Sequence, residues 1–357
     1  MKILKKIGFV LALLPLLANA QSDPKISQHL LTQTHYNPAV TGSTWMGNIT
    51  LLGRHQFMGF EGAPTTALLN FDVLAPTINS GFGLSVQYDK YGPINSYNAM
   101  VNYAYHIGIG DNQTLSLGLG AGVQMRQYDA TGNIYENPDD PISYYEQDTH
   151  IAPDVNFGIQ YSLQNWVIGA SITHLQRYFM KDDLRFPNVN YYAYTRYRFE
   201  LGRYWNITPG IAVHYDNVTV NEEVNLLVEY TKAIWFGASY RMSNELKPQS
   251  VVPMIGFNIT DYVKLGYAYE YNLTDLAQYN TGTHELMLTF RFKTRSNTYK
   301  TPRFAEWWPF AFVFFLPRYA QGFFHLKATK AELAIRLKQH LLLTLLNKKI
   351  YFLRSTM

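Results

Sequence analysis

The sequence predicts an all-β fold: a transmembrane antiparallel up-and-down β-barrel of the outer-membrane type, with about 14 strands. Three observations predict it: long runs of alternating apolar and polar residues, short turns that alternate with longer loops, and an unusual composition. Tyr accounts for 28 residues and charged residues for only 16% of the chain, whereas soluble domains carry about 25% charged residues. Strands with aromatic girdles at both membrane surfaces require such a composition.

The clearest alternating run covers residues 113–127. Its apolar positions are Leu115, Leu117, Leu119, Ala121, Val123 and Met125, and its small or polar positions are Thr114, Ser116, Gly118, Gly120, Gly122, Gln124 and Arg126. Because successive side chains of a strand point to opposite faces, we expect Leu117, Leu119 and Val123 to face lipid and the other set to face a lumen. The run 95–109 alternates in the same way, and Gly110-Asp111-Asn112 joins the two runs as a hairpin.

The same alternation predicts the remaining strands. The fourteen runs lie near 47–57, 64–74, 80–89, 95–109, 113–127, 152–163, 166–175, 190–203, 204–215, 224–231, 233–241, 251–260, 261–271 and 283–292. Very short connections at 110–112, 164–165, 231–232 and 260–261 alternate with longer ones at 128–151, 176–189, 216–223, 242–250 and 272–282. Short periplasmic turns and long outer loops are the rule for outer-membrane barrels, and an even strand count returns both ends of the barrel to the periplasm.

Residues 1–20 have the organisation of a secretory signal peptide. Lys2, Lys5 and Lys6 precede an apolar run over 7–17, and Ala18-Asn19-Ala20 is a small-residue cleavage site. The apolar run is too short for a spanning helix, which needs about 20 residues. We therefore expect cleavage after Ala20 and export to the outer membrane of a bacterial cell. The chain has no Cys, which excludes disulfides, thiolate metal sites and a lipid-modified cysteine.

The rest of the chain divides into three predicted parts. Residues 21–45 form a leader on the periplasmic side, too short for a globular plug, with turn chemistry at Asn37-Pro38-Ala39 and at Gly42. Residues 46–304 form the barrel, which ends on a strand with Leu286, Leu288, Phe290 and Phe292 on one face, as the barrel-insertion machinery requires. Residues 305–357 are an atypical aromatic and basic extension.

The extension leaves two alternatives open. Its aromatic block, 307–317, is interrupted by Pro309 and Pro317 and is too short to span a membrane as a helix. The basic stretch 331–341 has helical spacing suited to an anionic membrane surface. The alternative is a non-native sequence appended by a shifted reading frame or an altered stop codon, because the predicted barrel is already complete at Phe304. We therefore expect the extension to be dispensable for membrane insertion.

Net charge excludes nucleic acid as a partner. The formal net charge is +4. Residues 1–20 contribute +3 through three Lys, and residues 305–357 contribute +6 through eight basic and two acidic residues. Residues 21–304 are therefore net negative, and a nucleic-acid partner needs a basic surface.

Short motifs at the start of the chain carry a resemblance to a known family. Asn37-Pro38-Ala39-Val40-Thr41-Gly42 resembles the pattern Asn-Pro-Ala-x-x-Gly, and Arg54-His55-Gln56-Phe57 resembles Arg-x-Gln-Trp, with Phe in place of Trp. Gly62-Ala63-Pro64-Thr65-Thr66 resembles a Gly-Ala-Pro-x-Thr turn, which Asp72 and Gly81-Phe82-Gly83 follow. Thr301-Pro302-Arg303-Phe304 is similar to the usual end of the family. The chain thus resembles the PorP/SprF-like outer-membrane proteins of the type IX secretion and gliding motility machinery.

The resemblance implies a non-enzymatic role in exporting secreted proteins, such as adhesins, or anchoring them at the surface. It also implies partners: outer-membrane lipid, the secreted protein itself, and periplasmic components of the machine that include a peptidoglycan-linked protein. The candidate docking residues are those of the motifs: Asn37, Pro38, Ala39, Gly42, Arg54, Gln56, Gly62, Pro64 and Asp72. We expect Arg54 to pair with Asp72 and stiffen the first hairpin, whose outer turn, 59–64, presents a contact surface.

Catalytic and metal-binding patterns are few, and we expect no catalytic, metal or cofactor residues. The ten His show no metal-ligand spacing, and Gly118-x-Gly120-x-Gly122 lies inside a strand, so it is not a phosphate loop. An outer-membrane lipid-modifying enzyme would need a Ser/His pair, for which Ser85 or Ser171 with His106 or His174 are the candidates. The acidic loop 128–151 suits either Ca²⁺ or plain solvation, and its four Tyr favour a protein contact.

The main alternative function is a diffusion porin or substrate channel. A porin lines its lumen with charged rings, whereas many expected inward positions are small and neutral: Gly118, Gly120, Gly169, Ser171, Gly237 and Ser239. Small inward residues leave room for the leader or for a segment of a partner. The pattern therefore favours protein–protein binding over conduction.

Overall fold

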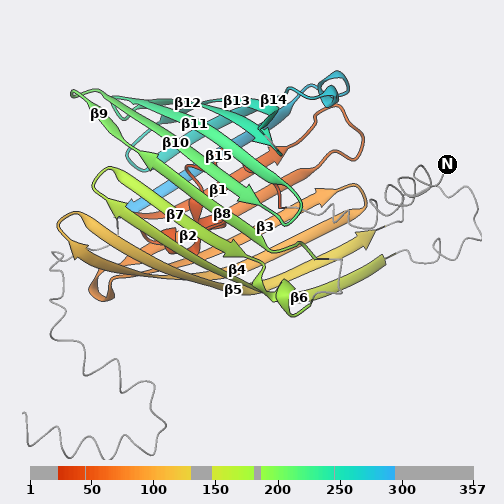
Figure 1. Cartoon of the computed structure of the whole chain (residues 1–357), viewed down its shortest axis with the longest axis horizontal. Coiled ribbons are helices and arrows are strands. Elements are labelled where there is room, and N and C mark those ends of the chain that lie inside the picture. The colour runs from red at the N-terminus through yellow and green to blue at the C-terminus, as the bar shows by residue number, and fades with distance from the viewer. Residues whose placement is uncertain (1–22, 45, 130–146, 181–185, 245, 294–357) are drawn as a thin grey trace, which may run out of the picture. The chain divides into compact units, whose positions relative to one another are not determined.

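The computed structural model describes residues 23–44, 46–129, 147–180, 186–244 and 246–293, and Figure 1 shows their strands winding into a barrel. The chain divides into two compact units, 1–299 and 300–357. All described residues belong to the first unit, so the predicted signal peptide and the extension 305–357 lie outside them. The predicted boundaries of these two segments remain predictions.

The described strands form a single antiparallel sheet that closes on itself. They are β1 (Met46–His55), β2 (Thr65–Ala75), β3 (Ser80–Tyr91), β4 (Ile94–Gly110), β5 (Gln113–Asp129), β6 (Gln147–Leu163), β7 (Trp166–Thr173), β8 (Asn190–Tyr197), β9 (Phe199–Leu201), β10 (Trp205–Tyr215), β11 (Val220–Tyr230), β12 (Ile234–Ser243), β13 (Lys247–Asn258), β14 (Val263–Asn272) and β15 (Thr283–Lys293). β15 pairs with β1, and β8 and β9 both pair with β10, so they are two parts of one strand. Over the described residues this makes a closed barrel of fourteen strands, and the predicted fold is confirmed.

The connections are sorted by length between the two ends of the barrel. The outer end is defined by the longer connections 56–64, 130–146, 174–189 and 273–282, and the inner end by short turns such as 111–112 and 164–165. Two outer connections are shorter than predicted, because β11 and β13 begin at Val220 and Lys247 rather than near 224 and 251. Glu223, at the end of the predicted loop 216–223, instead continues the alternation of β11 and faces the lumen.

The outer face of the wall is apolar, as the alternation predicts. On β5, Leu119 and Val123 are both 53% exposed, whereas Ser116 and Gln124 on the opposite face are buried. A row of exposed aliphatic and aromatic side chains continues on the neighbouring strands, for example Val101 on β4 and Phe157 on β6. The described helices are short 3₁₀ turns, and none of them is long and apolar enough to cross a membrane.

Replacing Leu119 with Arg is expected to lower the free energy of unfolding by about 2–4 kcal/mol, because the side chain lies on the lipid face in the middle part of the wall. Ile109, which is 58% exposed beside the inner turn 111–112, is the matched control. Arg at Ile109 should cost only about 0–1 kcal/mol at the membrane surface. Urea titration of both variants folded into lipid vesicles measures the difference, and equal losses would contradict the depth assigned to Leu119.

The segment before β1 lies inside the barrel, and we call residues 23–44 the plug. Its 3₁₀ turns η2 (Gln33–His35) and η3 (Pro38–Val40) are largely buried, and Ile26 joins a lumen cluster with Leu52, Leu68, Trp235, Val252, Met254, Ala268 and Met287. The sequence predicts a leader on the periplasmic side that is too short for a globular plug, and small inward residues that leave room for the leader or for a partner segment. Instead, 22 extended or turning residues are long enough to thread the lumen, because the wall presents small side chains and polar partners along the way.

Candidate functional site in the lumen

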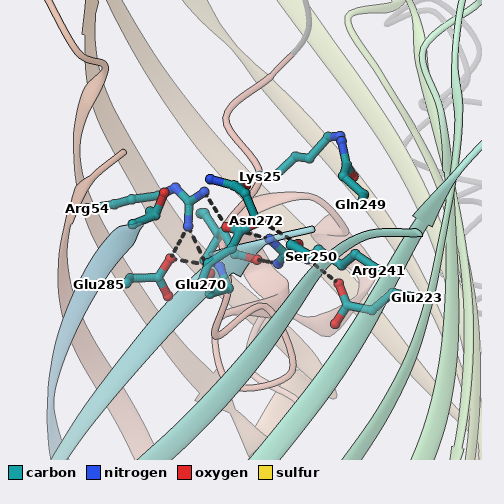
Figure 2. A network of polar contacts seen from close by, with 12 residues as sticks. Lys25, Arg54, Glu223, Arg241, Gln249, Ser250, Glu270, Asn272 and Glu285 are labelled. Atoms are coloured by element: carbon teal, nitrogen blue, oxygen red, sulfur yellow. Dashed lines mark hydrogen bonds and ion pairs between the residues drawn. The ribbon is translucent and has the colours of Figure 1, made fainter. Parts of the chain in front are cut away.

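Five charged side chains from five strands meet in the outer part of the lumen, as Figure 2 shows. Arg54 of β1 lies 2.8 Å from Glu270 of β14 and 3.4 Å from Glu285 of β15. Arg241 of β12 lies 2.8 Å from Glu223 of β11 and 3.0 Å from the same Glu270. The alternation of each strand points these side chains inward, where the Glu285 carboxylate is 0% exposed. Charges this deeply buried persist only when they are paired and hydrogen-bonded.

This charged cluster holds the plug by its main chain. The two oxygens of Glu285 accept hydrogen bonds from the backbone N–H groups of Ser27 and Gln28, each at 2.7 Å. Arg241 donates to the carbonyl oxygen of Ile26 at 3.0 Å, and Arg54 donates to the Ser27 hydroxyl at 2.8 Å. Because the charged side chains of the wall bond both to one another and to the plug, plug and wall form one polar network.

The first described residue of the plug is anchored at the outer end. Asp23 accepts from His174 Nε2 at 3.0 Å, and His174 Nδ1 lies 2.9 Å from Asp154 of β6. Asn190 and Tyr192, at the start of β8, donate to the same Asp23 carboxylate. Burial alone would raise the pKa of Asp23, but the adjoining His174 outweighs it and holds that pKa well below its usual range. The pKa of His174 is raised well above its usual value, because Asp23 and Asp154 outweigh the effect of its burial. A protonated His174 between two carboxylates therefore fixes Asp23.

The Asn-Pro-Ala motif packs against the wall in the half of the barrel nearer its inner end. Asn37 caps η3 by accepting from the N–H of Ala39 at 2.9 Å, and its amide donates to the Tyr194 hydroxyl at 3.0 Å. The wall makes room with glycine. A Cβ on Gly118 would lie 2.1 Å from the backbone nitrogen of Ala39, and one on Gly158 would lie 2.0 Å from Asn37 Oδ1. The motif therefore fixes a close contact between plug and wall.

The plug ends at the inner end of the lumen. His106 Nε2 donates to the carbonyl oxygen of Thr41 at 3.0 Å, while a Cβ on Gly81 would lie 1.9 Å from that oxygen. Gly42 has φ +66°, a conformation that favours glycine, and its N–H donates to Asp72 Oδ2 at 3.4 Å. The plug thus runs from Asp23 at the outer end to Gly42 at the inner end.

The expected pair of Arg54 and Asp72 is wrong. In the register of β1 and β2, Arg54 lies opposite Thr66 and Asp72 lies opposite Asn48. Six residues separate these positions along β1, about 20 Å at 3.3 Å per residue. Asp72 instead accepts from Asn48 at 3.1 Å and from the Gly42 N–H.

The sequence-predicted candidates separate into three places. Asn37, Pro38, Ala39 and Gly42 belong to the plug, with Asp72 beside its end, and Arg54 belongs to the charged cluster. Gln56, Gly62 and Pro64 lie in the outer loop between β1 and β2, where the N–H of Gln56 donates to the carbonyl oxygen of Pro64 at 2.8 Å. Sequence reasoning missed Glu223, Arg241, Glu270, Glu285 and Asp23, and it named His174 only as a candidate partner of a catalytic Ser. The available signal was an ionisable residue at an inward position of an alternating run, as at Glu285 between His284 and Leu286.

The candidate catalytic pairs do not form among the described residues. His106 Nδ1 lies 2.7 Å from Ser116 rather than from Ser85 or Ser171, and Ser85 donates to Asn70. His106 and Ser116 are buried beneath the plug, where a substrate has no access. Over the described part of the chain, no group of three or more His, Asp or Glu is arranged to hold a metal ion. Most of the acidic loop 128–151 lies outside the described residues, so its Ca²⁺ alternative remains untested.

Comparison with known proteins gives distant structural likenesses and one family. No curated protein sequence matches the chain. The structure is similar to the Acinetobacter baumannii outer membrane protein Omp33, at 11% identity and a TM-score of 0.42 over 70% of this chain and 99% of that one. It is similar to the P. putida toluene transporter TodX, at 9% identity and a TM-score of 0.44 over 74% and 94%. The Ralstonia pickettii toluene transporter TbuX matches at 10% identity and a TM-score of 0.45, over 72% and 92%.

The family is shown by the sequence itself. The family model described as type IX secretion system membrane protein PorP/SprF matches residues 18–290. The match spans the plug, with its Asn-Pro-Ala motif, and nearly the whole of the fourteen-stranded wall. This chain therefore belongs to the PorP/SprF family of type IX secretion system membrane proteins.

Proposed function

We propose that this protein is a non-enzymatic outer-membrane component of the type IX secretion system, which supports export or surface anchoring of secreted proteins such as adhesins by binding them. The observation that carries the proposal is the plug. This segment is anchored to the wall at its outer end, its middle and its inner end, so it occupies lumen space that a solute would otherwise cross.

The buried charges support binding over conduction. A porin uses charged side chains on the surface of a water-filled channel. Here Arg54 pairs with Glu285, and Arg241 donates to the plug backbone at Ile26. Two cavities beside the plug, among the described residues, have volumes of about 90 and 30 Å³. At about 10–15 Å³ for each water centre, each cavity holds no more than a small water cluster.

The outer loops offer the surface for a secreted partner. Met58 and Phe60 in the loop 56–64 are 40% and 53% exposed, and Tyr279 in the loop 273–282 is 67% exposed. The two loops are joined by backbone hydrogen bonds from Met58 N to Gly282 O at 2.8 Å and from Thr281 N to Met58 O at 2.9 Å. Exposed apolar and aromatic side chains on a braced surface are typical of protein–protein interfaces. The inner turns, with the signal peptide removed after Ala20, would face the periplasmic components, including the peptidoglycan-linked protein.

The test changes the two loops without touching the plug. We expect Phe60→Asp combined with Tyr279→Asp to abolish surface display of the secreted protein while barrel abundance and heat-modifiable migration stay normal. Ile259→Asp is the matched control, because Ile259 is 62% exposed at the inner end, and it should leave display intact.

A second measurement separates binding from conduction. The purified wild-type barrel in planar lipid bilayers should show no steady ion conductance. Normal display in the double variant, together with open wild-type channels, would replace the binding function with the diffusion porin.

A further inference from the structure

We propose that the outer face of β6, β7, β8 and β10 binds one acyl chain of a glycerophospholipid from the inner leaflet of the outer membrane. A groove of about 460 Å³ lies there, within the ~300–1,000 Å³ of small-molecule sites. The four strands are neighbours in the sheet, and β7, β8 and β10 are labelled in Figure 1.

The floor of the groove is made by two alanines. The strand register aligns Ile159, Ala170, Ala193 and Val213 in one row across the four strands. Ala170 and Ala193 therefore lie side by side between two larger aliphatic side chains. Both neighbouring rows hold larger residues. The row toward the outer end of the barrel is Phe157, Ile172, Tyr191 and Tyr215, and the row toward the inner end is Tyr161, Ile168, Thr195 and Ile211. Two small residues enclosed by large ones make a depression in an otherwise ridged wall.

The chemistry of the depression admits only an apolar occupant. Thr195 and Tyr161 bring hydroxyl groups to this face of the groove, and both are already hydrogen-bonded. Thr195 accepts from Trp166 Nε1 at 2.7 Å, and Tyr161 donates to Gln113 at 2.9 Å. A polar ligand would lose its hydration without a partner. A hydrocarbon chain in the groove would make dispersion contacts with the exposed side chains of Ile168 and Ile211, which these side chains lack when the groove is empty.

The depth of the groove favours lipid over a protein partner. The groove is continuous with the apolar belt that faces the membrane. Aromatic side chains lie on both sides of it along the strands. Those toward the inner end are Trp166, Tyr197 and Phe199, and those toward the outer end are Tyr191 and Tyr215. Aromatic girdles of this kind mark the level of the lipid head groups. The exposed Arg203 lies in the inner turn between β9 and β10, beneath the groove. A guanidinium group at this level suits the phosphate of a phospholipid whose chain occupies the groove.

The experiment uses a phosphatidylethanolamine with a photoactivatable diazirine in one acyl chain, in vesicles that contain the full-length barrel. Cross-links to the groove residues 159–170 and 193–213 should exceed those to the equally lipid-facing residues 117–123 on the order of tenfold, a preference of about 1.4 kcal/mol. Ala170→Phe combined with Ala193→Phe fills the groove and should remove the excess. Ala121→Phe, at another exposed outward position, should preserve it.

Each outcome decides the proposal. An even distribution of cross-links over all lipid-facing strands would mean that the groove takes only bulk lipid, and the site would be rejected. Capture of a second copy of the barrel through this face would make the occupant a protein, which also overturns it. Heat-modifiable migration of the alanine variants shows that they are folded, and outward positions in lipid tolerate large apolar side chains.

Discussion

Replacing Arg54 with Met is expected to lower the free energy of unfolding of the barrel by about 3–5 kcal/mol, because breaking a buried ion pair leaves an uncompensated charge. Here one side chain balances two carboxylates, Glu270 and Glu285, whose exposed fractions are 8% and 0%. The methionine fills much of the same volume, so the loss measures charge rather than packing. Urea unfolding in lipid vesicles is the appropriate measurement.

Arg198 provides the matched control for Arg54. It forms an equally short ion pair, 2.6 Å from Glu229, but its side chain is 42% exposed. Surface pairs contribute about 0–1 kcal/mol, so Arg198→Met should have a correspondingly small effect. If the two substitutions cost the same, the charged cluster does not stabilise the barrel, and the plug must be held by other contacts.

Replacing Gly118 with Val is expected to force the plug out of its seat and to open the lumen. The new Cβ would lie 2.1 Å from the backbone nitrogen of Ala39, and backbone cannot move aside as the end of a flexible side chain can. The outer face of β5 is untouched, so the wall should still close. Planar bilayer recordings should show steady conductance in the variant and none in the wild type.

The control for Gly118 is Gly53 on β1, where an added Cβ meets no atom within 4 Å. Gly53→Val should therefore fold normally and remain closed. A folded Gly118→Val barrel that stays silent would show that the plug can shift without opening a path. The claim that the plug seals the lumen would then fall, whatever the fate of the binding function.

The wall was predictable from the sequence because its information is local. Leu117, Gly118 and Leu119 alternate in a way that only a strand between two different environments requires, and hairpin turns fix which strands are neighbours. Strand ends were less predictable where charge continues the alternation, as at Glu223. Inward charge at a strand end is stable there because Arg241 on the neighbouring strand β12 pairs with Glu223.

The site was less predictable because its contacts join distant parts of the chain. The carboxylates that bind Arg54 lie 216 and 231 residues further along, while the predicted partner, Asp72, was chosen for its nearness in sequence. The plug has no periodicity of its own, since the wall binds its backbone at Ser27, Gln28 and Ile26. Main-chain recognition leaves little trace in the side chains of the segment that is recognised.

The contact between Glu285 and the plug imposes an order of assembly. Glu285 lies on β15, the strand whose pairing with β1 closes the wall. The same strand therefore closes the barrel and binds the plug inside it. A cylinder completed without the plug would bury Glu285 without the backbone N–H donors of Ser27 and Gln28, and Arg241 without the carbonyl oxygen of Ile26. A buried charge that loses hydrogen-bond partners is costly. Closure of the seam is therefore coupled to the presence of the chain's own beginning. Ser27 and Gln28 must therefore lie in the lumen before β15 pairs with β1.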